Sequence, residues 1–244
     1  MIQLTAFSKS YTSRKNAPLA VRDFSMTCKT GEITGILGLN GAGKTTILKA
    51  ICARHFATSG QVLVEGVNAS ENPEQVRNLT GFVAEEPNLP GEYTVEEYLN
   101  MVAELHGIKE NNTLLIDQLS LEELLPKKIR TLSKGQRERV NFAQALIYNP
   151  KVLVLDEPAS GLDPAQILKM RSLVKSLKTD HTILLSTHLM QEVEALCDRV
   201  YIIHEGHLAA SGTAEEIAAQ FECKNLEEAF FKITSASDIV GEQK

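Results

Sequence analysis

The feature that most constrains the fold is the glycine-rich segment Gly38–Thr45, which fits the pattern G-x-x-x-x-G-K-[ST]. The apolar run Ile33–Leu37 precedes it, and a helical pattern over Lys44–Ala53 follows it. Glycines let a backbone wrap around a polyphosphate with its N–H groups pointing inward, and the start of a helix adds a positive dipole end. The segment therefore predicts a strand, a phosphate-binding loop and a helix. The candidate contacts are Gly38, Asn40, Gly41, Ala42, Gly43, Lys44, Thr45 and Thr46.

A second polar motif, Asp156 and Glu157, follows the apolar run 152–155. Ligands of α/β sheets bind at the carboxyl ends of strands, so we expect Asp156 to face, through a water, the Mg²⁺ held by the Thr45 hydroxyl. Glu157 is placed to orient or deprotonate an attacking water, while Lys44 reaches the β- and γ-phosphates. The alternatives are a solvated acidic strand end for the carboxylates and a helix-capping turn for the glycines.

Strand patterns alternate with helical patterns along most of the chain. Three of the strands are apolar on both faces, as in a parallel sheet that is covered on both sides. The predicted fold is α/β: a mostly parallel sheet with helices on both faces, a P-loop NTPase core, beside a small antiparallel β layer. The predicted strands are Ile2–Ala6, Val21–Cys28, Ile33–Leu37, Val62–Val64, Gly81–Ala84, Val152–Leu155, Thr182–Ser186 and Val200–Ile203. The predicted helices are Lys44–Ala53, Val95–Leu105, Gly135–Tyr148, Ala165–Leu177 and Leu189–Leu196.

The stretch 88–130 differs from the rest because it is polar, helical in pattern and without strand patterns. We predict that it forms a helical lobe inserted into the P-loop core. The core with its antiparallel layer then comprises 1–87 and 131–220, and 221–244 forms a C-terminal helix and tail. A hairpin turn is expected at 204–207.

Composition excludes several classes of protein. With 31 acidic and 25 basic residues, the net charge of −6 argues against nucleic acid as the main partner. The apolar runs are far shorter than the roughly 20 residues of a membrane span, and the start of the chain has no signal-peptide pattern. The four cysteines are widely spaced, which predicts reduced thiols in a cytosolic protein. The alternative is a reactive thiol, for which Cys52 is the candidate because it lies near the phosphate loop.

A pentapeptide about 20 residues before Asp156 makes the comparison with known families specific. Its residues are Leu132, Ser133, Lys134, Gly135 and Gln136, in the pattern L-S-x-G-Q. With the phosphate loop upstream and the two carboxylates downstream, the chain resembles the nucleotide-binding subunit of an ABC transporter. The resemblance implies that the serine, the glycine and the helix N–H groups bind the ATP of a second subunit, in a head-to-tail dimer. An ordinary serine N-cap is the alternative.

Three more parts of the sequence match motifs of that family, and one position departs from its pattern. The D-loop, which crosses the dimer interface, would be Ser160, Gly161, Leu162 and Asp163. The resemblance makes His188 the γ-phosphate switch histidine and Tyr11 the aromatic residue that stacks on adenine. Glu85 stands where the family usually has a Mg²⁺-contacting glutamine, with Glu86 as the neighbouring register. The alternatives are a helix cap for Asp163, a structural histidine, a half-buried strand tyrosine and a surface acid.

The resemblance implies an ATP- and Mg²⁺-dependent ATPase that powers transport through a separate integral membrane permease. The second nucleotide-binding subunit is expected to be another copy of this chain, with a different partner chain as the alternative. The protein is expected to be cytoplasmic, on the inner face of the membrane. The segment Asn225–Phe231 resembles the end of subunits that partner ABC-2-type export permeases, which favours export. Two rival hypotheses are a soluble ABC-type ATPase with an assembly role and a non-enzymatic, ATP-gated binding module.

Overall fold

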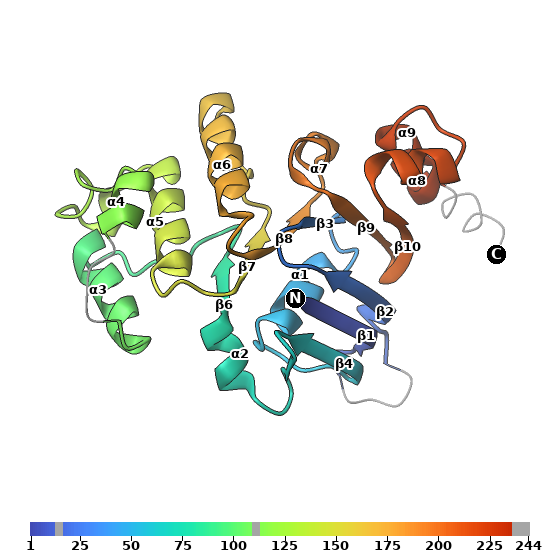
Figure 1. Ribbon diagram of the computed structural model, residues 1–244, viewed down its shortest axis with the longest axis horizontal. Helices are drawn as coiled ribbons and strands as arrows, with labels where there is room; N and C mark the ends of the chain where they lie inside the picture. Colours follow the sequence, from blue (N-terminus) through green and yellow to red (C-terminus); the bar gives the residue numbers. More distant parts are fainter. Residues whose placement is uncertain (13–16, 109–112, 236–244) are drawn as a thin grey trace.

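A computed structural model describes residues 1–12, 17–108 and 113–235 of the chain (Figure 1). Within these ranges, its centre is a six-stranded sheet of order β10-β9-β3-β8-β7-β6, parallel except for the β9–β10 hairpin. Every residue of β3, β7 and β8 is buried, as the apolar runs predict for strands covered on both faces. The strands are β3 (Ile33–Leu37), β6 (Thr80–Val83), β7 (Val152–Asp156), β8 (Thr182–Thr187), β9 (Arg199–His204) and β10 (His207–Gly212).

A second sheet, of order β2-β1-β4-β5, is antiparallel where its pairing is defined. It comprises β1 (Ile2–Lys9), β2 (Val21–Cys28), β4 (Ser59–Val64) and β5 (Val67–Asn68). Its inner face packs over helix α1 (Lys44–Ile51) in one apolar cluster. The cluster includes Phe7 and Phe24 of this sheet, Ile47 of α1 and Val154 of the central sheet. The antiparallel layer therefore holds α1, the helix that follows the phosphate loop, against the central sheet.

The predicted helical lobe lies at one end of the molecule, opposite the C-terminal helices α8 (Ala214–Gln220) and α9 (Leu226–Ser235) (Figure 1). It contains α3 (Val95–Leu105), α4 (Thr113–Gln118) and a 3-10 turn, Ile129–Thr131. Its apolar residues share one cluster with the central sheet and with α5 (Lys134–Leu146), α6 (Pro164–Leu177) and α7 (Met190–Leu196). The lobe is thus continuous with the core through α5.

Two differences from the predicted helices have local causes. The predicted helix Lys44–Ala53 ends at Ile51, because Ala53 adopts a left-handed backbone with φ 49°. The short helix α2 (Pro73–Leu79) was not predicted, since seven residues give too little periodicity to recognise. In the part of the chain that the structure describes, none of the helices combines the length and apolar character needed to cross a membrane.

Side chains of α5 occupy the free edge of the central sheet. β6 is the last strand, so its outward carbonyl groups need partners from elsewhere. Asn141 donates an amide N–H to Ala84 O at 2.9 Å, and Gln144 donates one to Phe82 O at 3.3 Å. Asn141 also donates to Glu138 Oε1 at 3.3 Å, within the interior of the protein.

Buried Glu138 gives the first prediction. Burial raises its pKa to about 7, although the hydrogen bond from Asn141 opposes the shift. When the pKa of a carboxyl is raised in the folded state, the protein loses stability as the pH rises from the ordinary pKa of the group to about 7. Glutamine has no charge to bury, so Glu138→Gln should raise the free energy of unfolding relative to the wild type. This gain should be larger at pH 8 than at pH 5 by roughly 2 kcal/mol.

Thermal unfolding at both pH values measures this difference, with Glu123→Gln as the matched control because Glu123 is exposed. An equal effect of Glu138→Gln at pH 5 and pH 8 would contradict a buried carboxyl that titrates near neutrality.

Candidate nucleotide-binding site

The phosphate loop connects the carboxyl end of β3 to the start of α1. Gly43 has φ 113°, a left-handed backbone that favours glycine. A Cβ on Gly38 would lie 2.6 Å from Ile203 O, so a larger residue would displace the neighbouring strand β9. The backbone therefore requires glycine at both positions. Asn40, Gly41 and Thr45 are exposed at this loop, which leaves their polar groups open to a ligand.

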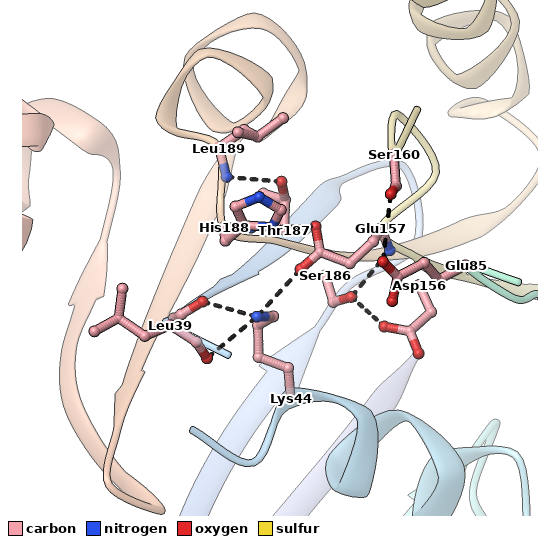
Figure 2. Close-up of polar contacts among 11 residues, drawn as sticks. Leu39, Lys44, Glu85, Asp156, Glu157, Ser160, Ser186, Thr187, His188 and Leu189 are labelled. Atoms are coloured by element: carbon pink, nitrogen blue, oxygen red, sulfur yellow. Dashed lines mark hydrogen bonds and ion pairs between the residues drawn. The ribbon is translucent and has the colours of Figure 1, made fainter. Parts of the chain in front are cut away.

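Lys44 extends along the inside of the loop (Figure 2). Its Nζ donates to Gly38 O at 2.7 Å and to Leu39 O at 3.4 Å. The same nitrogen lies 3.1 Å from Glu157 Oε1, and both side chains are almost fully buried, with 6% and 7% exposed. Among the residues that the structure describes, Glu157 Oε1 has no well-aligned hydrogen-bond partner, so its contact with Lys44 is an ion pair.

Glu157 begins the turn after β7 with a left-handed backbone, φ 48°. Such a conformation costs roughly 1 kcal/mol or more in a residue other than glycine, and is found where function or surrounding structure holds it. The Glu157 N–H contacts Ser186 O at 3.1 Å and Ser186 Oγ at 3.2 Å. Its Oε2 lies 2.8 Å from His188 Nδ1 and accepts from His188 N–H at 3.3 Å. The carboxylate therefore lies between the lysine and the histidine (Figure 2).

Asp156 is the last residue of β7 and is paired in register with Ser186 of β8. The Ser186 hydroxyl donates to Asp156 Oδ1 at 2.6 Å. The serine thus orients both acids of the motif, since it also accepts from the Glu157 N–H. Sequence reasoning gave Ser186 no role, because only the β7–β8 register shows that it faces the carboxylates.

The L-S-x-G-Q segment forms the start of α5. Ser133 Oγ accepts from Gln136 N–H at 3.3 Å, and Gln136 Oε1 accepts from Ser133 N–H at 2.9 Å. The N-cap alternative is therefore correct as a structural role, and Ser133 and Lys134 remain exposed. Leu132 is buried beneath them. A Cβ on Gly135 would lie 2.4 Å from the Gln166 amide nitrogen of α6, so a larger residue would make that side chain move.

The segment Ser160–Asp163 connects the carboxylate motif to α6. Asp163 caps α6 by accepting from Gln166 N–H at 2.9 Å, as its alternative role predicted. Gly161 has φ 66°, and a Cβ there would collide with the Lys134 ammonium. Partly exposed Leu162 packs against the apolar cluster. The segment is therefore in contact with the L-S-x-G-Q helix of its own chain.

Glu85 lies in the loop after β6 and is exposed. Its Oε1 accepts from the Ser160 hydroxyl at 3.3 Å (Figure 2). The sequence pattern did not predict this contact, since the two residues are 75 positions apart. A role of Glu85 as a Mg²⁺ ligand remains a prediction.

Tyr11 lies beyond the end of β1 and is 62% exposed, so it is not the half-buried strand residue of the alternative interpretation. Its hydroxyl is 3.0 Å from Thr46 Oγ1 on α1. The structure therefore places Tyr11 beside the phosphate loop. Cys52, near the same helix, is buried, and burial raises the pKa of its thiol to about 12, so it is not a reactive thiolate.

Comparison with known proteins agrees with this geometry. The family model described as ABC transporter matches residues 21–160. The chain belongs to the ABC transporter family. NatA, an ABC transporter ATP-binding protein of Bacillus subtilis, is 36% identical over 89% of this chain and 91% of its own length. The bacitracin transport ATP-binding protein BcrA of Bacillus licheniformis is 36% identical over 85% of this chain and 68% of its own.

Other members differ in length or come from solved structures. The mouse organic anion transporter ABCA8B is 38% identical, but the chain spans 13% of that protein. The solved ATP-binding subunit of an ABC transporter superposes with a TM-score of 0.87 at 29% identity, covering 96% of this chain and 99% of that one. A dimeric bacterial cassette, at 24% identity and a TM-score of 0.79, has the same fold. This member of the ABC family is thus an ATP-binding subunit and an ATPase, and the predicted fold is confirmed.

Proposed function

We propose that this ABC ATPase drives export of a substrate through separate integral membrane permease subunits. The observation that carries the proposal is the cluster of Lys44, Glu157 and His188 at the carboxyl ends of β3, β7 and β8. It joins a phosphate-binding cation to a carboxylate that can activate water. The names of NatA and BcrA support a role in transport. The resemblance of 225–231 to the end of ABC-2-type subunits supports export.

Lys44 has two alternative partners in this mechanism. Its ammonium contacts the Glu157 carboxylate and donates to a loop carbonyl. The β- and γ-phosphates of ATP would draw the ammonium away, because they offer a greater negative charge in the same buried loop. Glu157 would then be free to orient and deprotonate the attacking water. His188 would keep the carboxylate in place through Nδ1 and present its other face to the γ-phosphate.

Mg²⁺ fits the hard oxygen donors on the ATP side of this cluster. In the described ranges no group of three or more His, Cys, Asp or Glu side chains could hold a metal ion by itself. Thr45 and Asp156 would hold Mg²⁺, and Glu85 would approach it from the loop after β6. Bound there, Mg²⁺ would neutralise charge on the transferring phosphoryl group.

The L-S-x-G-Q segment would act on the ATP of a second copy. Its helix α5 packs along β6, and β7 and β8 separate β6 from β3. Three strand spacings amount to about 14 Å, so exposed Ser133 is remote from the phosphate loop of its own chain. A two-fold dimer would bring Ser133 and Gly135 of each chain to the ATP of the other, with the Ser160–Asp163 segment crossing the interface.

Closure of this dimer would be passed to the permease through the helical lobe and the Glu85 loop. The chain would then lie on the cytoplasmic face of the membrane, held there by the permease. Co-purification from native membranes in mild detergent tests this arrangement. We expect the tagged chain to bring down an integral membrane protein and to hydrolyse ATP faster with it than alone. A chain found wholly in the soluble fraction would overturn the transport role and favour the assembly ATPase.

A further inference from the structure

Three side chains form a hydrogen-bonded chain at one side of the phosphate loop. Thr46 Oγ1 is 3.0 Å from the Tyr11 hydroxyl, and this hydroxyl is 3.3 Å from His55 Nε2. The three residues come from α1, from the segment after β1 and from the turn after α1. Sequence analysis gave His55 no function, and nothing in its local pattern links it to Tyr11.

The surroundings of His55 hold it against Tyr11. The two rings meet edge to face, with centroids 5.7 Å apart and an interplanar angle of 86°. Lys9 lies over the Tyr11 ring at 5.5 Å, and its Nζ donates to Phe56 O at 2.7 Å, which ties β1 to the turn that carries the histidine. His55 Nδ1 is buried and has no hydrogen-bond partner among the described residues.

The number of available protons decides which atom donates in each of these hydrogen bonds. Burial and the charge of Lys9 lower the pKa of His55 against the opposing effect of backbone hydrogen bonds, which favours a neutral imidazole with one N–H. A buried N–H without a partner is rarer than an unpaired acceptor, which places the proton on Nε2 and leaves Nδ1 as the acceptor. The bonds then run from Nε2–H to the Tyr11 oxygen and from the Tyr11 O–H to Thr46 Oγ1. The Thr46 proton is left for an external acceptor.

We propose that His55 is a positioning residue of the nucleotide site, which directs the Thr46 hydroxyl toward a nucleotide phosphate through the Tyr11 hydroxyl. This inference rests on the proposed function, in which Thr46 contacts phosphate and the Tyr11 ring stacks on the base. His55 touches no part of the nucleotide. It fixes the donor direction of Thr46 and the place of the Tyr11 ring before ATP arrives, so its contribution appears in nucleotide affinity.

Substitution of His55 tests the hydrogen bond. His55→Leu keeps a side chain of similar bulk without a donor, whereas the amide of His55→Gln can place an N–H near the position of Nε2. We expect Kd for a fluorescent ATP analogue to rise about tenfold in His55→Leu and to stay within about threefold of the wild type in His55→Gln, with kcat at saturating ATP unchanged in both. His207→Leu, at an exposed histidine on β10, is the control.

A double-mutant cycle shows whether His55 acts through Tyr11. Tyr11→Phe keeps the ring and removes the hydroxyl, so it should weaken binding about as much as His55→Leu does. The double variant should then be no weaker than either single variant, within about twofold. If the fold-increases in Kd of the two single variants multiply in the double variant, the proposal is wrong, because His55 then acts independently of the Tyr11 hydroxyl. If His55→Leu does not fold, His55→Asn, which is too short to reach Tyr11, takes its place in the cycle.

The outcomes separate this inference from the proposed function. If the wild type binds the ATP analogue and Lys44→Ala does not, but His55→Leu binds normally, the role of His55 is wrong and the nucleotide site stands. If the wild type itself does not bind, the nucleotide site is wrong and the role of His55 falls with it.

Discussion

Glu157→Gln is expected to lower ATP turnover by about 10²- to 10³-fold while leaving ATP affinity within about threefold of the wild type. Glutamine keeps the shape of the side chain and can still accept from the His188 N–H. It loses the negative charge and the ability to take a proton from water. It also ends the ion pair with Lys44, which frees the ammonium for the phosphates, so any change in affinity should be toward tighter binding.

Slow turnover should also make the closed dimer visible. Light scattering of Glu157→Gln should show a monomer alone and a dimer with ATP. Glu227→Gln, at an exposed position on α9, should behave like the wild type in both assays. A variant that still hydrolyses ATP at the wild-type rate would remove Glu157 from the catalytic role. A monomer with ATP bound would leave the phosphate site intact and contradict self-pairing of this chain.

The sequence was sufficient to predict which residues lie at the ends of the central strands. A motif that follows an apolar run must lie where the strand ends, and parallel strands bring such ends to one edge of the sheet. The pattern of residues therefore placed Lys44, Asp156 and Glu157 in one site, and the family resemblance added His188. The strand order could not be predicted, because many orders satisfy the same alternation of strands and helices.

The contacts that were missed depend on that order or on surface segments. The bond from Ser186 to Asp156 requires the β7–β8 register, and the bond from Ser160 to Glu85 requires the loop after β6 to lie beside the turn after β7. Asn141 looks like a polar residue on an amphipathic helix until β6 is known to be the edge strand. His55 lies in a turn, outside any helical or strand pattern, so nothing in the sequence links it to Tyr11. Long-range polar contacts leave almost no trace in a single sequence.

Lys44→Ala is expected to weaken binding of MgATP by at least about 100-fold, since the loop loses a buried, charge-assisted donor to the β- and γ-phosphates. It should also destabilise the fold, because Glu157 would keep a buried carboxylate without its cation. Removing one partner of a buried pair costs roughly 3–5 kcal/mol, although His188 remains beside this carboxylate and reduces the cost.

The double variant Lys44→Ala/Glu157→Gln separates these two effects. Replacing the carboxylate by an amide removes the unpaired charge, so the unfolding midpoint should return toward that of the wild type while ATP binding stays lost. Lys49→Ala, at an exposed position on the same helix, controls for the loss of one lysine from α1. Equilibrium titration with MgATP and thermal unfolding give the two readouts on the same samples.

If Lys44→Ala binds MgATP as tightly as the wild type, the phosphate loop has been assigned wrongly. If it unfolds at the wild-type temperature, the Lys44–Glu157 pair contributes nothing to stability. If both losses occur and only stability returns in the double variant, Lys44 both stabilises the fold through Glu157 and binds the phosphates of ATP.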